Sequence, residues 1–308
     1  MLSEEITAPV KQYSLDEAFS YCEATVNARY ENFPVASLFL PQEKRPYIQA
    51  IYAFSRVADD FADESDRTQE ERLQELDAWE QKLKQCYEGN ADHPVFIALS
   101  ETVKRLDIPI DPLKNLLSAF RRDVVQHRYE TFGDVLEYCV CSANPVGRLV
   151  LTIFGHRDDV LLRMSDDICT ALQLANFWQD VFIDRQRDRL YIPLEDMRRY
   201  GYSLEDWRRG VMNEKFREMM KFQVGRTREL FYRGAKLPSL VERELQVELR
   251  LVWFGGMAIL KGLDRVGYDV LHRRPTLKGF QKGLILLRAL IYNDITNYGK
   301  KRKAWDLT

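Results

Sequence analysis

The stretch Gln173-Leu-Ala-Asn176-Phe-Trp-Gln-Asp180-Val-Phe-Ile-Asp184 decides the fold class of this chain. Its polar residues recur every three or four positions, so on an α-helix they form one stripe along a single face. Leucine, phenylalanine, tryptophan and valine fill the positions between them. This pattern predicts a mostly buried helix whose polar stripe faces an interior cleft.

A second stretch, Tyr52-Ala-Phe-Ser-Arg56-Val-Ala-Asp59-Asp60-Phe-Ala-Asp63, has the same design. Both stretches end in D-x-x-x-D, which puts two carboxylates about one helical turn apart. Like charges at that spacing destabilise a helix unless a cation neutralises them. Two such stripes in one chain therefore indicate a shared site, which requires that one domain enclose both.

The rest of the chain reads as helical, because apolar residues recur at three- and four-residue spacing between proline and glycine breakers. Alternating strand patterns are missing. We predict an all-α bundle around a central cavity, formed by a single domain over residues 1–308 with its core at about 13–290 and a short basic C-terminal tail.

Composition excludes several function classes. The 308 residues carry 45 basic and 47 acidic side chains, a balance that gives no sign of nucleic-acid binding. Five cysteines without C-x-x-C spacing argue against a disulfide framework or a zinc site. The four histidines have no ligand spacing.

No apolar run reaches membrane-spanning length, and the acidic start does not resemble a signal peptide. We expect a cytoplasmic protein, with peripheral contact at the inner face of the membrane as an option. The tail Lys300-Lys301-Arg302-Lys303 with Trp305 is most simply a solvated tail, and membrane contact is its alternative.

Magnesium is the cation that suits these carboxylates. It takes one or two carboxylate oxygens and completes its octahedron with water and phosphate oxygens. Several Mg²⁺ ions between the two helices would hold a diphosphate, and the aromatic side chains nearby would suit a carbocation. The alternative is that arginines pair with the aspartates, because Arg185, Arg187 and Arg189 closely follow Asp184 and Arg56 precedes Asp60 by one turn.

Three segments resemble the squalene/phytoene synthase family, all-α class I isoprenoid synthases. They are the two stretches above, with the one that ends at Asp184 continued by Arg189-Leu-Tyr191-Ile-Pro193, and a third segment, Tyr138-Cys-Val-Cys-Ser-Ala-Asn-Pro-Val-Gly147. The resemblance implies metal–diphosphate ligands at Asp59, Asp63, Asp180 and Asp184 with help from Asp60, and a diphosphate site lined by Tyr52, Arg56, Gln173 and Asn176. It also implies that Tyr138 acts near the leaving group and the carbocation, although a core tyrosine is the alternative.

Departures from the family pattern point to a subgroup. Phe182-Ile183 stands where Gly-Glu is usual, and Asn144-Pro145 interrupts the usual Ala-Gly. These features, with Asn-Phe-Pro-Val-Ala-Ser37 and Arg265-Val-Gly-Tyr-Asp-Val270, resemble bacterial hydroxysqualene synthases of hopanoid biosynthesis. The implied reaction converts presqualene diphosphate and water to hydroxysqualene, without NADPH.

Other functions stay open at this point. They are squalene or phytoene synthase proper, which condenses two farnesyl or geranylgeranyl diphosphates, a catalytically silent relative that acts as an assembly factor, and a chain-elongating prenyltransferase or terpene cyclase. The Gln-Leu-Ala-Asn-x-x-x-Asp stripe argues against the last. A partner synthase for lipid transfer is a further expectation.

Overall fold

The computed structural model describes residues 13–28, 40–64, 66–296 and 298, and in them the regular secondary structure consists of helices joined by loops and turns. The helices are α1 (Leu15–Asn27), α2 (Arg45–Asp63), α3 (Gln69–Tyr87), α4 (Pro94–Leu106), α5 (Asp111–Val125), α6 (Phe132–Ser142), α7 (Asn144–Ile153), α8 (Asp159–Gln186), α9 (Leu194–Arg199), α10 (Leu204–Arg209), α11 (Glu214–Gly234), the 3₁₀ helix η1 (Leu237–Leu240), α12 (Arg243–Arg265) and α13 (Gly279–Ile291). Between the described residues, the only strand-like pairing is one isolated bridge, Arg128 to Leu190. The all-α prediction is confirmed. The extent of the domain stays a prediction.

Local sequence explains where the helices begin. The predicted breakers Pro46, Pro94 and Pro112, and also Pro145, lie in first turns, where the backbone N–H that proline lacks would have no partner within the helix. Other helices begin with capping boxes, such as Thr131 with Asp134 at α6.

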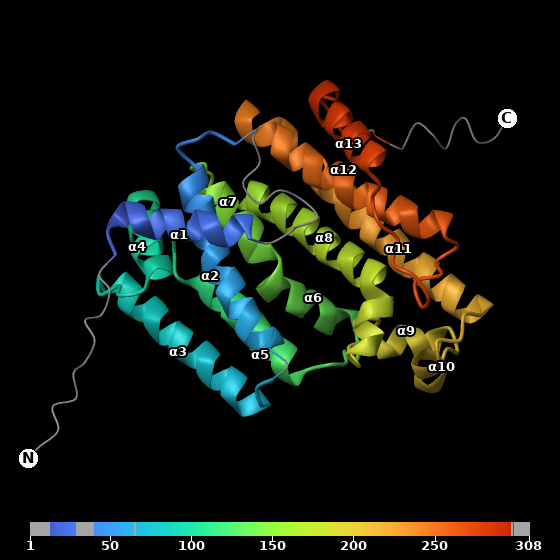
Figure 1. The fold of residues 1–308 in the computed structure, drawn as a ribbon. Coiled ribbons are helices and arrows are strands. Elements are labelled where there is room, and N and C mark those ends of the chain that lie inside the picture. Colours follow the sequence, from blue (N-terminus) through green and yellow to red (C-terminus); the bar gives the residue numbers. More distant parts are fainter. Residues whose placement is uncertain (1–12, 29–39, 65, 297, 299–308) are drawn as a thin grey trace, which may run out of the picture.

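The long helix α8 occupies the middle of the molecule, with α11, α12 and α13 on one side and α1 to α5 on the other (Figure 1). It contacts α6, α7, α11 and α12, while α2 contacts α1, α3, α4 and α5. The two predicted polar stripes therefore belong to helices at the centres of two neighbouring groups.

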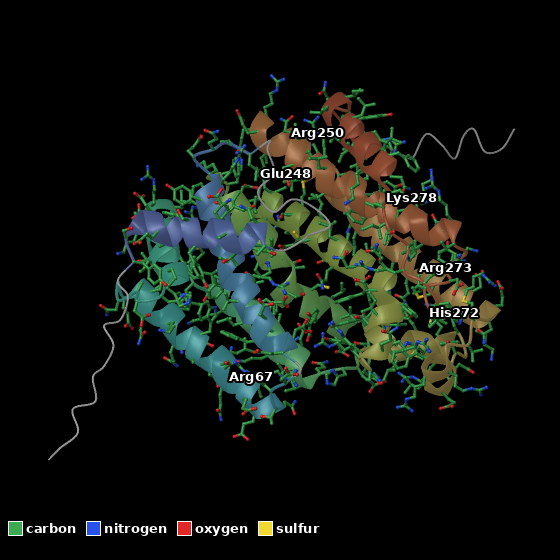
Figure 2. The ribbon with its side chains drawn as sticks, viewed as in Figure 1. Arg67, Glu248, Arg250, His272, Arg273 and Lys278 are labelled. Atoms are coloured by element: carbon green, nitrogen blue, oxygen red, sulfur yellow. The ribbon has the colours of Figure 1, made fainter. Side chains whose placement is uncertain are left out.

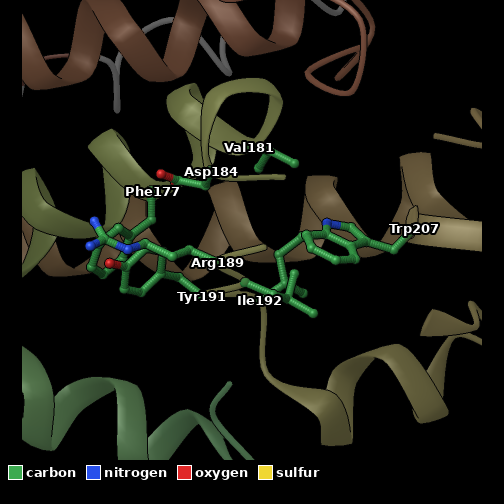
Figure 3. Close-up of a pocket in the computed structure, with 8 residues that line it drawn as sticks. Phe177, Val181, Asp184, Arg189, Tyr191, Ile192 and Trp207 are labelled. Carbon is green, nitrogen blue, oxygen red and sulfur yellow. The ribbon is translucent and has the colours of Figure 1, made fainter. Parts of the chain in front are cut away.

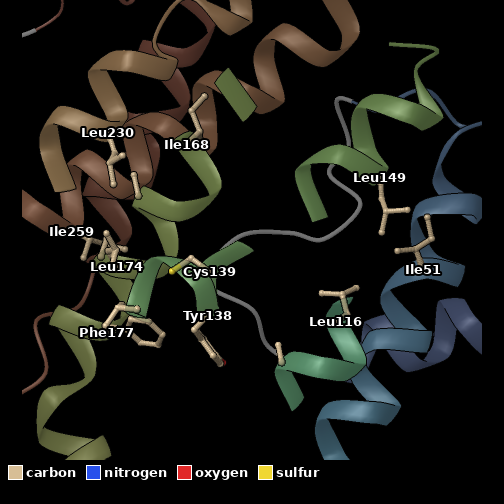
Figure 4. Packing of buried hydrophobic residues seen from close by; sticks show 14 of the residues in the cluster. Ile51, Leu116, Tyr138, Cys139, Leu149, Ile168, Leu174, Phe177, Leu230 and Ile259 are labelled. Carbon is tan, nitrogen blue, oxygen red and sulfur yellow. The ribbon is translucent and has the colours of Figure 1, made fainter. Parts of the chain in front are cut away.

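The buried side chains form one continuous core that reaches both groups of helices. Figure 4 shows part of it, with Tyr138 and Cys139 of α6 beside Phe177 and Leu174 of α8. Fully buried Trp178 satisfies its indole N–H by donating to Thr227 Oγ1 at 2.8 Å. Most of α8 is thus fixed by packing, and its polar stripe is presented from a rigid element.

Among the described residues, no helix is long and apolar enough to cross a bilayer.

Candidate active site

The C-terminal ends of α2 and α8 are joined by ion pairs. Asp63, in the last turn of α2, accepts a hydrogen bond from Arg189 Nη2 at 3.1 Å and lies 3.5 Å from Arg187 Nη1. Both arginines follow directly after α8. The aspartate motif of α2 therefore lies beside the end of α8, the helix that carries the other motif, as a shared site requires.

Arginines hold four of the five predicted carboxylates. Arg56 lies 2.9 Å from Asp59 and 2.6 Å from Asp60, so the expected Arg56–Asp60 pair is present. Arg274 makes two hydrogen bonds to Asp180, of 2.5 and 3.1 Å. Together with Asp63, these pairs match the arginine-paired alternative drawn from the sequence.

Asp184 differs from the other four carboxylates. Within the described parts of the chain, no arginine or lysine lies within ion-pair distance of it. It lines a small pocket together with Phe177, Arg189, Tyr191 and Trp207, among others (Figure 3). Burial raises the pKa of Asp184 to about 7, and the nearby charge of Asp180 adds to the effect. A cation bound at this point would relieve that repulsion.

The donor set fits Mg²⁺, because carboxylate oxygens at the ends of two facing helices are the ligands this ion prefers. In the described residues, however, no three acidic, histidine or cysteine side chains already converge on one point. Arg56, Arg189 and Arg274 balance the charge there instead. Binding of the metal would require these arginines to release the carboxylates.

The remaining predicted stripe residues lie on the same two helices. Tyr52 and Arg56 on α2 are partly buried, as are Gln173 and Asn176 on α8. Their flanking residues Ile51, Phe54, Leu174, Phe177 and Trp178 are buried, as the apolar pattern predicts. Contact of the four stripe residues with a diphosphate stays a prediction.

Tyr138 is buried and bonded to a carboxylate that the sequence analysis missed. Its hydroxyl donates to Asp123 Oδ2 at 2.8 Å, and the Tyr191 hydroxyl donates to Asp123 Oδ1 at 3.4 Å. Burial raises the pKa of Asp123 to about 7, against the lowering effect of the Tyr138 hydrogen bond and of Arg189. Burial, with Asp123 next to it, also raises the pKa of Tyr138 well above 10.

The segment after α8 positions two of these groups. Its backbone pairs with the loop before α6, since Leu190 N donates to His127 O and Leu194 N donates to Tyr129 O, both at 3.0 Å. With the backbone fixed, Arg189 reaches Asp63 while the Tyr191 ring stacks on Phe177, the ring centroids 3.7 Å apart and the planes at 6°. An aromatic wall therefore lies next to the carboxylates.

Residues 26–281 match the squalene/phytoene synthase family. The chain belongs to the squalene/phytoene synthase family. The 15-cis-phytoene synthase of Synechococcus elongatus is 31% identical over 287 residues, 87% of this chain and 91% of that protein. The hydroxysqualene synthase of Zymomonas mobilis is 35% identical over 227 residues, 72% of this chain and 75% of that protein.

Solved structures agree with this assignment. Squalene synthase HpnC from Alicyclobacillus acidocaldarius is 41% identical, with a TM-score of 0.79 over 82% of this chain and 95% of that one. A dehydrosqualene synthase with bound ligand has a TM-score of 0.81 at 24% identity, covering 90% of this chain and 96% of that one, and shows the fold alone. Members of this squalene/phytoene synthase family are isoprenoid synthases that act on prenyl diphosphates, so the predicted enzyme class is confirmed.

One departure from the pattern of the squalene/phytoene synthase family, Asn144, lies in a close contact between α7 and α8. Asn144 begins α7, and its Oδ1 accepts a hydrogen bond of 2.9 Å from Thr170 of α8, with both residues buried. Three residues on, a Cβ at Gly147 would lie 2.2 Å from Ser165 Oγ and 2.5 Å from Cys169 Sγ. A side chain at position 147 would therefore force Ser165 and Cys169 of α8 to shift.

Two residues of the site, Asp123 and Arg274, were not predicted from the sequence. Asp123 occupies a position in α5 where the three- and four-residue spacing from buried Leu113 and Leu116 continues, so a carboxylate on an apolar face was the available signal. Arg274 gave no such signal, because it lies in a loop 94 residues from Asp180.

Proposed function

We propose that this chain is a Mg²⁺-dependent hydroxysqualene synthase, which converts presqualene diphosphate and water to hydroxysqualene and diphosphate. One observation carries the proposal: carboxylates from the ends of α2 and α8 lie beside a pocket whose other wall is aromatic. Such a site combines a place for a metal–diphosphate leaving group with rings that stabilise a carbocation.

The subgroup is supported by two findings. The Zymomonas mobilis relative is named a hydroxysqualene synthase and is 35% identical. Phe182-Ile183 and Asn144 also follow the pattern on which the resemblance to that subgroup rests. The proposed reaction needs no nicotinamide, because water takes the place of a hydride donor.

The metal would be held by Asp59, Asp63, Asp180 and Asp184, with Asp60 beside them. When bound there, Mg²⁺ acts as a Lewis acid that stabilises the departing diphosphate. The arginines that now neutralise these carboxylates would be released from them when the site holds a metal. Arg56, Arg189 and Arg274 would then donate hydrogen bonds to the diphosphate oxygens, which suit the guanidinium group as well as a carboxylate does.

The aromatic wall acts on the organic part of the substrate. Breaking the carbon–oxygen bond leaves both electrons on the diphosphate and a positive charge on carbon. The stacked rings of Phe177 and Tyr191 present π faces that attract such a charge. The water oxygen then bonds to the cation and loses one proton to a base. Our candidate for that base is the Asp123 carboxylate, which accepts hydrogen bonds from Tyr138 and from Tyr191 of the aromatic wall.

A second candidate function is phytoene or squalene synthase. It is favoured by the 31% identity to the 15-cis-phytoene synthase of Synechococcus elongatus, which extends over more of the chain than the hydroxysqualene synthase match. A third, outside catalysis, is a silent relative that serves as an assembly factor.

Product analysis tests the three functions. Purified protein is incubated with Mg²⁺ and farnesyl, geranylgeranyl or presqualene diphosphate, with and without NADPH. Hydroxysqualene formed from presqualene diphosphate without NADPH supports the proposal. Phytoene from geranylgeranyl diphosphate, squalene made only with NADPH, or no product from any substrate would each overturn it.

A further inference from the structure

The helix α13 exposes apolar side chains on the face turned away from the bundle. Phe280 is 73% exposed, Leu287 52% and Ile291 63%, and Leu284 lies on the same helical face at the same spacing. Seven of the 14 large apolar residues that are exposed in the described chain fall between Phe280 and Tyr292. A concentration of this kind marks an interaction surface.

The opposite face of α13 packs against the rest of the protein. Ile285 and Ala289 are buried against α12, whose Arg250 donates to the carbonyls of Ala289 at 3.0 Å and Tyr292 at 2.7 Å. Figure 2 shows Arg250 at one end of α13 and Lys278 at the other. The helix is therefore fixed on the protein by one apolar face and presents a second.

The charges along α13 are all positive. From Leu277 to Tyr292 the chain carries Lys278, Lys282 and Arg288 and no carboxylate, although the protein as a whole has a net charge of −2. The sequence that follows adds the cluster Lys300-Lys301-Arg302-Lys303 and Trp305, whose structure lies outside the described residues. Apolar side chains bordered by cations match the surface of a bilayer that contains anionic lipids.

We propose that α13 docks this protein on an anionic membrane surface, with Phe280, Leu284, Leu287 and Ile291 inserted between the lipids. Two copies of the chain meeting through the same face would bring their lysines and arginines together, and like charges disfavour that contact. Docking through α13 does not depend on the reaction proposed above, because its apolar face and its cations lie outside the candidate active site. The proposal assigns the peripheral membrane contact expected from the sequence to one helix, α13.

Vesicle flotation with the full-length protein tests the proposal. We expect the protein to float with vesicles that contain phosphatidylglycerol, more weakly with pure phosphatidylcholine vesicles, and less at high salt. The double variant Leu284→Glu/Leu287→Glu should bind phosphatidylglycerol vesicles at least about tenfold more weakly. Its helical circular dichroism should match that of the wild type, since both side chains are exposed.

A matched control separates this face from apolar exposure in general. Leu15→Glu/Val160→Glu adds the same two charges at exposed apolar positions on α1 and α8, and should bind vesicles like the wild type. No flotation of the wild type, or equal flotation of the α13 variant, would overturn the proposal. So would a wild-type dimer that the α13 variant converts to a monomer, because it would assign the face to a second copy of the chain.

Discussion

The substitution Asp123→Asn should stabilise the protein and impair its activity. Asp123 has a pKa of about 7 in the folded chain, because burial disfavours its charged form, against 3.8 for the unfolded group. As the pH rises above 3.8, the unfolded chain releases this proton while the folded chain retains it. Folding stability is therefore lost until the pH reaches about 7, and the loss is complete above that pH.

The size of the loss follows from the two pKa values. They differ by about three pH units, each worth about 1.4 kcal/mol, so the ionised Asp123 costs up to about 4 kcal/mol. Asparagine has nearly the same shape, cannot ionise and still offers an oxygen to the Tyr138 hydroxyl. The variant should gain stability relative to the wild type between about pH 5 and pH 8, by about 3 kcal/mol.

Urea unfolding of both proteins across that pH range, with EDTA present, measures the difference. Asp184 has a similar pKa but is the same in both proteins, so its contribution cancels. A difference that does not change with pH would refute the burial argument for Asp123. Hydroxysqualene formation at about pH 8 should fall at least about tenfold in the variant, since the proposed base is gone. Unchanged turnover would remove Asp123 from the mechanism.

Two further predictions concern the arginine pairs and the helix contacts. Arg274→Gln should tighten the binding of Mg²⁺ in the absence of substrate, because Asp180 loses the guanidinium that competes with the metal, and it should also lower turnover. The thermal shift of the protein as Mg²⁺ is titrated measures this binding. An unchanged Mg²⁺ midpoint would contradict the idea that arginines hold the metal ligands. Gly147→Ala should cost about 1–3 kcal/mol of unfolding free energy in urea, because its Cβ would lie 2.2 Å from Ser165 Oγ, whereas Gly225→Ala, in the open on α11, should gain up to about 1 kcal/mol. Equal effects of the two glycine substitutions would refute the close-packing argument at Gly147.

Local patterns in the sequence were enough to predict the helices and the two polar stripes. The spacing of Asp59 and Asp63, and of Asp180 and Asp184, follows from helical geometry alone, so their shared faces needed no structure. The first turns marked by prolines were predictable for the same reason.

The pairings between distant segments could not be predicted in this way. Arg274 lies 94 residues from Asp180, and only the tertiary fold brings the two together. Asp123 and Tyr138 come from different helices, so neither sequence segment records their hydrogen bond. The exposed face of α13 also needed the structure, because only the fold shows which of its apolar residues pack against α12.

The release of diphosphate from presqualene diphosphate, followed as Mg²⁺ is titrated, tests the central claim most directly. The claim is that the aspartates of α2 and α8 act together on one metal–diphosphate group. We predict that Asp63→Ala and Asp184→Ala each lower the rate at saturating Mg²⁺ by at least about a hundredfold, while Asp16→Ala, an exposed carboxylate on α1, leaves it unchanged. Wild-type rates in either Asp63→Ala or Asp184→Ala, or diphosphate release that does not depend on Mg²⁺, would contradict the account.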